Sequence, residues 1–353
     1  MERDERLEIL RGLPKVDLHR HLEGSIRFET LRELGRRNRV NLPVDNPLAL
    51  APLVHFNPRE PRSLKTFLSK FHCDWYRSYK DIERVAAEVV QDAALEGVVH
   101  LELRFSPEHL TRTSHLEQDG VLQAVSEAAR AAAEEYDLGV RLLLTLVRER
   151  YDFDRWKRVV DRAAERQLEL GVVGVDLAGD EFNYPNALFE RIFTRVRDAG
   201  VLGISIHAGE GTSHSQVTSA VEVLHARRIG HGLKAVEEPG VMAMLAQRRI
   251  ALEICPVSNF QTGCVDNLAE HPLPALDQAG VPVTLNSDDP CIHGTTLCDE
   301  YDVAATLWGY GLDDLLRLER YAVEAAFLPE EDREALRERV EKGYQESRGQ
   351  GFL

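Results

Sequence analysis

The first residues along the chain whose types and spacing suit metal chemistry are His19 and His21, in the segment KVDLHRH. In an extended strand alternate side chains point to the same face, so both imidazoles would converge on one point. Neutral imidazole nitrogens bind zinc at roughly 2.0–2.1 Å. An isolated H-x-H pair is a weak signal, because two histidines in a strand can also be ordinary core residues.

Two further histidines stand at the ends of later strand-like runs. His207 is followed by Ala208, Gly209 and Glu210. We expect His207 to supply a third nitrogen, and Glu210 to lie close to the metal while remaining free to move a proton. His231 lies between two glycines in RIGHG, which let the backbone turn sharply and a ligand approach. Taken singly, each fragment also fits a core histidine beside an exposed loop.

Two adjacent carboxylates, Asp288 and Asp289 in NSDDP, end the last strand-like run. Adjacent carboxylates repel, so this position needs a cation or a hydrogen-bonding partner. We expect Asp288 to supply an oxygen ligand and Asp289 to face the substrate; the alternative is a capped turn before Pro290. Chance does not readily place four histidines and an aspartate at strand ends, and the combination predicts a zinc site.

These residues need elements that bring them together. Eight short β-branched runs alternate with segments that have apolar residues at three- and four-residue spacing, which predicts parallel strands joined by helices. Several of the runs are preceded by a glycine that ends the helical segment before them: Gly97, Gly139, Gly171, Gly200 and Gly280. The expected strands are Lys15 to His21, Val98 to Ser106, Val140 to Val147, Val172 to Gly179, Ile204 to His207, Arg228 to His231, Ala251 to Cys255 and Val281 to Asp288.

Eight strand–helix units favour a closed (β/α)8 barrel of the α/β class, which carries its active site at the carboxyl ends of its strands. We expect one domain over residues 1–353, with its core at about 13–345. The segment from about 30 to 80 is too long for a simple connection and predicts helices inserted after the first strand. Within it SLKTFLSKF, residues 63–71, would form a lid or pocket wall. The charged tail, EEDREALRERVEKGYQESRGQ, predicts a solvated terminal helix that frays.

The composition of the chain indicates which classes of partner and substrate it can bind. The chain has a net charge of -16, from 59 acidic and 43 basic residues, which disfavours nucleic acid and anionic membranes as partners. A small neutral or cationic substrate is more natural. Five cysteines form no CxxC pair, and neither a secretory signal nor a membrane span is evident. We therefore expect free thiols and a cytoplasmic location.

The ordered set PKVDLHRHLEGS, SLKTFLSKF, LELRFSP, DLAGDE, HAGE, RIGHG, CPVSN and NSDDP resembles the adenosine deaminase family, within the amidohydrolase superfamily. The likeness runs from about Leu13 to Glu300 and implies a (β/α)8 barrel with one zinc ion. It implies that the zinc ligands are His19, His21, His207 and Asp288. It further implies that Glu210 is the general acid/base and that His231 orients and deprotonates the zinc-bound water. Asp289 would contact purine N7, and Gly179 would contact N3. Phe67 and Phe71 would belong to an apolar cover over the substrate.

The chemistry agrees with this resemblance. Zinc lowers the pKa of a bound water to about 7, which gives hydroxide near neutral pH. Attack at C6 of a 6-aminopurine becomes tolerable when N1 is protonated as the bond forms, and a glutamate can provide that proton. Superfamily members with two metals commonly carry a modified lysine at the end of the fourth strand. Here that strand ends in DLAG, which favours a single metal.

One motif departs from the family pattern. The family's nucleoside deaminases commonly have HLDG after the histidine pair, with the aspartate near the ribose 5′-hydroxyl, whereas this chain has HLEG with Glu23. We favour adenosine and 2′-deoxyadenosine as substrates, with 6-amino-6-deoxyfutalosine and then adenine as alternatives. A different amidohydrolase activity, or a catalytically silent binding protein on the same barrel, are the rival interpretations.

Overall fold

The computed structural model describes residues 2–72 and 74–348, and its centre is one sheet of eight parallel strands in the order β1 to β8. The strands are β1 (Lys15–His21), β2 (Val98–Phe105), β3 (Gly139–Val147), β4 (Val172–Ala178), β5 (Gly203–Ala208), β6 (Arg228–His231), β7 (Ala251–Ile254) and β8 (Val283–Leu285). Each strand pairs with the next along the chain. An isolated bridge between Arg20 and Asp288 joins β1 to the residues after β8. The predicted (β/α)8 barrel is therefore confirmed.

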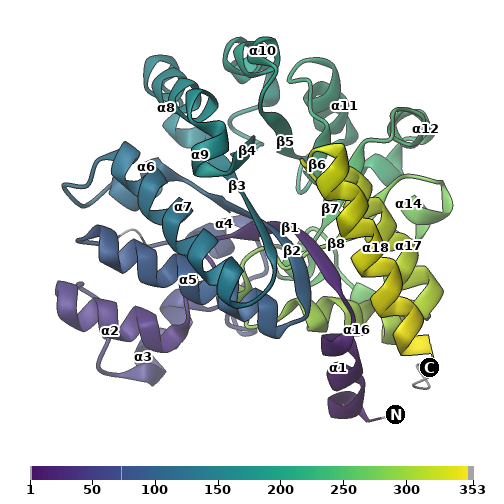
Figure 1. The fold of residues 1–353 in the computed structure, drawn as a ribbon, viewed down its shortest axis with the longest axis horizontal. Coiled ribbons are helices and arrows are strands. Elements are labelled where there is room, and N and C mark those ends of the chain that lie inside the picture. Colours follow the sequence, from purple (N-terminus) through teal and green to yellow (C-terminus); the bar gives the residue numbers. More distant parts are fainter. Residues whose placement is uncertain (1, 73, 349–353) are drawn as a thin grey trace.

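Helices surround the strands, as Figure 1 shows. They are α1 (Arg3–Gly12), α2 (Phe28–Asn38), α3 (Pro47–Val54), α4 (Leu64–Leu68), α5 (Tyr79–Leu95), α6 (Pro107–Thr111), α7 (Gln118–Glu135), α8 (Phe153–Glu165), α9 (Gln167–Leu170), α10 (Glu190–Ala199), α11 (His214–Glu222), α12 (Pro239–Arg248), α13 (Pro256–Gln261), α14 (Leu273–Gln278), α15 (Pro290–His293), α16 (Leu297–Leu307), α17 (Leu312–Ala325) and α18 (Glu330–Ser347). Short 3-10 helices are η1 (Arg148–Arg150), η2 (Asn186–Phe189), η3 (Leu233–Glu237) and η4 (Leu268–Glu270). Helices α2, α3 and α4 occupy the long connection expected between the first two strands.

The predicted strand bounds hold to within one or two residues except at the last strand. We expected it to run from Val281 to Asp288, but β8 covers only Val283–Leu285. Asp288 has a φ of 58°, a left-handed backbone that a regular strand does not accommodate. The carboxylate pair therefore follows the strand on irregular backbone.

The turns before the strands mostly use glycine as predicted. Gly97, Gly171, Gly200 and Gly280 all have positive φ, between 65° and 83°. The prediction is wrong for Gly139, which is already the first residue of β3. The left-handed residue in that turn is Asp137, with a φ of 53°. Aspartate tolerates this conformation better than most side chains do.

The terminal helix is better packed than its composition suggested. Leu336, Val340 and Tyr344, at four-residue spacing, are all buried in α18. This stripe packs against α17, and the two helices lie side by side in Figure 1. The expectation of a solvated, fraying helix is therefore wrong for Glu330–Ser347, because one apolar stripe suffices to dock a charged helix. Residues 349–353 lie outside the described residues.

The barrel interior contains ion pairs as well as apolar side chains. Glu253 accepts from Arg228 Nε at 2.5 Å and from Arg104 Nη2 at 2.8 Å, and Arg228 Nη2 also reaches Glu102 at 2.6 Å. All four side chains are fully buried. Against the effect of burial, the two arginines hold the pKa of Glu253 well below its ordinary value. This ionised network lies directly beneath the carboxyl ends of the strands.

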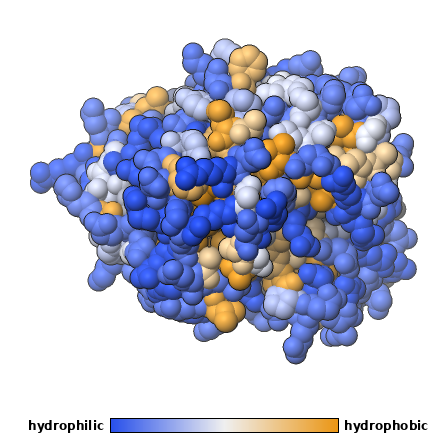
Figure 2. Space-filling model, turned by 90° about the horizontal axis from the view of Figure 1, so that it is seen from above, coloured by the Kyte–Doolittle hydropathy of each residue, from blue (hydrophilic) through white to orange (hydrophobic). Residues whose placement is uncertain are grey.

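The outer surface agrees with the charge of the chain. Hydrophilic residues cover most of the face in Figure 2, with hydrophobic residues in small groups among them. No helix within the described residues is long and apolar enough to cross a membrane. Four cysteines, Cys255, Cys264, Cys291 and Cys298, are free thiols, and Cys73 lies outside the described residues.

Candidate metal centre and active site

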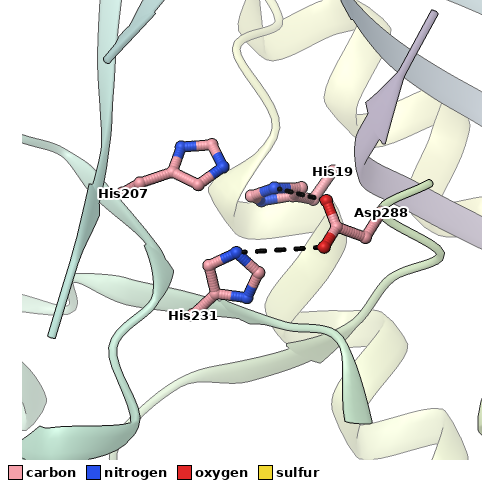
Figure 3. Close-up of side chains that lie close together, drawn as sticks. All are labelled: His19, His207, His231 and Asp288. Atoms are coloured by element: carbon pink, nitrogen blue, oxygen red, sulfur yellow. Dashed lines mark ion pairs between the residues drawn. The ribbon is translucent and has the colours of Figure 1, made fainter. Parts of the chain in front are cut away.

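The proposed ligands lie at the carboxyl ends of the strands. His19 and His21 are in β1, His207 is in β5, His231 ends β6 and Asp288 follows β8. His231 has a φ of 61° and Asp288 one of 58°, both in the left-handed region. Such strain is found where the surrounding structure holds a functional side chain in place. Figure 3 shows His19, His207, His231 and Asp288 pointing toward one another.

The ligand atoms converge closely. One atom from each of His19, His207, His231 and Asp288 lies within 4.8 Å of the others. His21 joins this group, because its Nε2 is 3.3 Å from His207 Nε2 and 3.5 Å from Asp288 Oδ1. His19 Nε2 lies 3.4 Å from the same Asp288 oxygen. The structure therefore brings together all four predicted ligands and His231.

Hydrogen bonds behind the site turn the ligand nitrogens inward. His19 Nδ1 is 2.7 Å from Glu253, and His207 Nδ1 is 2.8 Å from Asp176. A carboxylate on Nδ1 makes that nitrogen the donor and leaves the Nε2 lone pair for a metal. His19 Nε2 is buried and has no hydrogen-bond partner among the described residues. Burial lowers the pKa of His21 well below its ordinary value, so this imidazole stays neutral. The neutral imidazole of His21, the inward-facing Nε2 atoms of His19 and His207 and the carboxylate of Asp288 form a donor set that fits zinc.

A line of hydrogen bonds fixes the tautomer of His231. The Leu273 N–H donates to His271 Nδ1 at 3.0 Å, so His271 Nε2 carries the proton and donates to Asn259 Oδ1 at 3.3 Å. Burial lowers the pKa of His271 to about 3, which keeps its ring neutral. Asn259 then donates through Nδ2 to His231 Nδ1 at 3.1 Å. His231 Nε2 therefore carries a proton and presents it to the site, 3.8 Å from Glu210 Oε2.

Glu210 lies on a turn that is clamped from outside. The carboxylate of Glu181 accepts from four consecutive backbone N–H groups, those of residues 209 to 212, at 2.8, 2.9, 3.0 and 3.2 Å. Burial, together with the negative charges of Asp288 and Glu181, raises the pKa of Glu210 to about 8. The side chain is therefore a buried acid that holds a proton at neutral pH and can pass it to a bound group.

Asp289 is a second protonated acid. Burial and the neighbouring Asp288 raise its pKa well above the ordinary value, and its Oδ1 has no hydrogen-bond partner among the described residues. Gly24 makes room for it, since a Cβ at that position would lie 1.6 Å from Asp289 Oδ1. Any larger residue at position 24 would displace the acid. Asp289 can therefore donate its proton to a ligand acceptor.

The pocket above these groups has a volume of about 300 Å³. The four apolar residues of the predicted lid, Leu64, Phe67, Leu68 and Phe71, all line it. The helix itself is short, because α4 ends at Leu68 and Phe71 lies beyond it. Phe67 stacks on His293 with ring centroids 5.1 Å apart and planes at 7°. His21, Glu23, Gly179, Glu210, His231, Asp288 and Asp289 line the same pocket.

The sequence matches the profile of the family described as Adenosine deaminase over residues 14–343. The chain belongs to the adenosine deaminase family. An adenosine deaminase of Klebsiella pneumoniae (strain 342) is 39% identical over 94% of this chain and 99% of its own length. An adenosine deaminase of Shewanella loihica is 38% identical over 92% of this chain and 97% of its own.

Solved structures of similar fold include other deaminases. An adenine deaminase from Arthrobacter aurescens has a TM-score of 0.86 at 26% identity, covering 94% of this chain and 99% of its own. An amidohydrolase from Burkholderia ambifaria with bound zinc has a TM-score of 0.87 at 25% identity, covering 98% and 94%. Arabidopsis ADAL in complex with IMP has a TM-score of 0.83 at 28% identity, covering 96% and 99%. The likeness spans the whole barrel.

Six residues of this adenosine deaminase family site had no role assigned from the sequence, and one of them, His271, lies in none of the motifs quoted for the resemblance. Gly24, Asp176, Glu181 and Asn259 lie within motifs that carried the resemblance, HLEGS, DLAGDE and CPVSN. Their position in the same motifs as the predicted site residues is the sequence signal that could have identified them. Glu253 also lies outside these motifs, because it is inside the run ALEIC and only its inward position in β7 reveals it.

Proposed function

We propose that this member of the adenosine deaminase family is a zinc-dependent hydrolase that converts adenosine and 2′-deoxyadenosine to inosine and 2′-deoxyinosine, with release of ammonia. The observation that carries the proposal is the convergence of three histidines and Asp288 beside the clamped, protonated Glu210. His19, His21, His207 and Asp288 would hold one ion. The absence of a lysine from DLAG at the end of β4 supports one rather than two. Zinc supplies a nucleophile near neutral pH by lowering the pKa of a water to about 7.

The protein's own residues supply the proton transfers and the positioning. Glu210 would deliver its proton to purine N1 as water adds to C6, and its carboxylate would then take a proton from the added water and pass it to the amino group, which leaves as ammonia. Positioned proton transfer of this kind typically contributes about 10²–10⁴-fold. The His231 Nε2–H would orient the attacking water. Because this nitrogen already carries a proton, it cannot also deprotonate the water, which is the second role that the resemblance implies. Asp289, which keeps its proton, would donate to N7, and the backbone N–H of Gly179 would face N3. Each of these side chains, and Gly179, lines one pocket.

The remaining parts of the pocket support a nucleoside ligand. Phe67 and Phe71 meet edge to face with centroids 5.1 Å apart and form an apolar wall against which a purine can pack. Glu23 accepts from the Ser106 N–H at 2.7 Å, and burial raises its pKa to about 7. We place the sugar on this side of the pocket. A cytoplasmic location stays a prediction, supported by the four free thiols.

The test is ultraviolet monitoring of the zinc-loaded protein with adenosine, 2′-deoxyadenosine and adenine in parallel, together with an ammonia assay. We expect both nucleosides to be converted faster than adenine. Chelation should abolish turnover, and added zinc should restore it. A pure, folded protein that holds no transition metal, or one that releases no ammonia from any 6-aminopurine, would contradict the proposal. Hydrolysis of lactones or cyclic amides alone would instead support the rival amidohydrolase activity.

A further inference from the structure

One carboxylate of the substrate pocket has no part in the mechanism proposed above. Glu149, in η1 directly after β3, lines the pocket, and its Oε2 is buried without a hydrogen-bond partner among the described residues. Buried polar atoms are nearly always paired, because an unpaired one has lost its hydrogen bonds to water without replacement. An unpaired carboxylate oxygen in a substrate pocket therefore points to a hydrogen-bond donor on the ligand.

The turn after β4 fixes the position of Glu149. Its Oε1 accepts from the Asp180 N–H at 3.0 Å. Its Oε2 packs against Gly179, where a Cβ would lie 2.3 Å away. Gly179 has a φ of 107°, which favours glycine, so the same residue forms the turn and lets the carboxylate approach. Oε2 thus lies beside the residue whose N–H would face purine N3.

The neighbouring arginines do not supply the missing donor. Arg148 directs its guanidinium to the Asn186 side chain at 2.8 Å and to the His207 carbonyl at 2.7 Å. Arg150 also lines the pocket, but it is exposed. No ion pair links Glu149 to a basic side chain in the part of the chain that the structure describes. The free acceptor therefore remains available to a bound molecule.

The order of the strands around the barrel indicates which part of a nucleoside meets Oε2. In the proposed binding mode, Asp289 after β8 faces N7, Glu210 after β5 faces N1 and Gly179 after β4 faces N3. The next strand in this direction is β3, which carries Glu149. The next positions of the purine ring in the same direction are C4 and N9, and N9 bears the sugar. Glu149 therefore faces the ribose on the N3 side of the base.

The ribose hydroxyl on that side is the one at C2′. In a nucleic acid helix, N3 of adenine and the 2′-hydroxyl both open onto the minor groove, so the two groups share one edge of the nucleoside. The 5′-hydroxyl is on the exocyclic carbon and extends away from the base. A hydroxyl can donate to a carboxylate, and such charge-assisted hydrogen bonds are roughly twice as strong as neutral ones.

We propose that Glu149 is a specificity-determining residue whose Oε2 accepts a hydrogen bond from the ribose 2′-hydroxyl of the substrate. The inference rests on the proposed deaminase function and deepens it. Adenosine is then the better of the two proposed substrates. With 2′-deoxyadenosine bound, Oε2 stays buried and unpaired, and a site built to bond a hydroxyl discriminates against the analogue that lacks it.

The experiment compares kcat/KM for adenosine, 2′-deoxyadenosine and 2′-deoxy-2′-fluoroadenosine, whose fluorine replaces the hydroxyl but cannot donate a hydrogen bond. The variant is Glu149→Gln. The Asp180 N–H needs an acceptor, so the amide oxygen would stay on it and the new NH2 group would replace Oε2. Glu108→Gln is the matched control, because Glu108 lines the same pocket but already pairs with Arg155 at 2.7 Å.

We expect the wild type to prefer adenosine over both analogues by about 10- to 100-fold, as expected for a hydrogen bond to a charged acceptor. Glu149→Gln should lower the preference for adenosine over 2′-deoxyadenosine about tenfold. It should also raise the use of the fluoro analogue relative to 2′-deoxyadenosine, because an NH2 group donates where the carboxylate accepts. Glu108→Gln should leave all three ratios at their wild-type values.

The wild-type ratios decide the proposal even where Glu149→Gln fails to fold, which its Tm and zinc content reveal. A wild type that converts adenosine and 2′-deoxyadenosine equally well overturns the 2′-hydroxyl contact and leaves the deaminase function intact. So does a preference for adenosine that persists unchanged in a folded Glu149→Gln protein. Release of no ammonia from any of the three nucleosides would instead overturn the proposed function itself.

Discussion

Replacing Glu181 with glutamine tests whether its hydrogen bonds to the backbone of residues 209 to 212 position Glu210, the proposed catalytic acid. The substitution is isosteric, but it removes the negative charge and turns one acceptor oxygen into a donor. Glu181 Oε1 takes three of the four hydrogen bonds, including the one from the Glu210 N–H, and Oε2 takes the one from Gly209. The amide oxygen would keep the three, and the new NH2 would face the Gly209 N–H.

The cost follows from these contacts. A hydrogen bond to a charged acceptor contributes about 1.5–3 kcal/mol and a neutral one about 0.5–1.5 kcal/mol, so each of the three retained bonds weakens by about 1 kcal/mol. The buried Gly209 N–H, left facing a donor, adds about 1–3 kcal/mol. Because the bonds share one carboxylate and do not add fully, we expect the free energy of unfolding to fall by about 3–5 kcal/mol. At about 2 °C per kcal/mol for a chain of this size, Tm would drop by about 6–10 °C.

Activity should fall for a separate reason. A displacement of a catalytic group by about 1 Å costs on the order of 10²-fold, so we expect Glu181→Gln to lower kcat about 10²-fold with zinc still bound. Calorimetry, metal analysis and steady-state kinetics measure the three quantities. Asp180→Asn is the control, because that carboxylate accepts from Phe182 and Asn183 instead of the catalytic turn. A lowered Tm with wild-type kcat would show that Glu181 only stabilises the fold, and an unchanged Tm would refute the estimate of the bond energies.

Four further predictions address other parts of the molecule. Glu210→Ala should abolish turnover while zinc content stays at the wild-type level; near-normal kcat would remove this residue from the mechanism. Asp288→Ala should lower the zinc content of the purified protein, and an unchanged content would mean that the ligand set is misassigned. His271→Phe should free the Asn259 amide to flip and lower kcat about 10- to 100-fold, as typical for partners of metal-site residues; a change in kcat below twofold would argue against the tautomer relay. Burial raises the pKa of Glu319 from 4.5 to about 8, so its stabilising neutral form is lost as the pH rises from 4.5 through 8. As the pH rises across this window, the Tm of Glu319→Gln should therefore increase relative to the Tm of the wild type. A difference in Tm that stays constant with pH would contradict the raised pKa of Glu319.

Local patterns made most of the barrel predictable from the sequence. The bounds of β1 and β6 were predicted to the residue, because both are short buried runs that end in a histidine. In α5, the apolar residues that recur at three- and four-residue spacing from Ile82 to Ala93 are all buried, and the capping box of Ser78 and Asp81 begins the helix. The chemistry-bearing side chains were found because parallel strands expose their carboxyl ends at one edge.

What escaped prediction depends on contacts between distant segments. The pairs of His19 with Glu253 and of His207 with Asp176 join residues 234 and 31 positions apart, and no local periodicity marks them. The packing of α18 likewise depends on α17. The shortness of β8 follows from the left-handed backbone at Asp288, which is set by contacts across the barrel and not by the sequence of the strand.

The seam between the first and last strands has a consequence for how the protein matures. The His21 N–H donates to the Asp288 carbonyl, and the Asp288 N–H donates to the His19 carbonyl, each at 2.8 Å. The residues that would bind the ion are thus the ones that close the barrel. A growing polypeptide that has not yet reached position 288 offers imidazoles without the carboxylate and without the seam. The full set of four proposed ligands can therefore assemble only after translation has passed position 288.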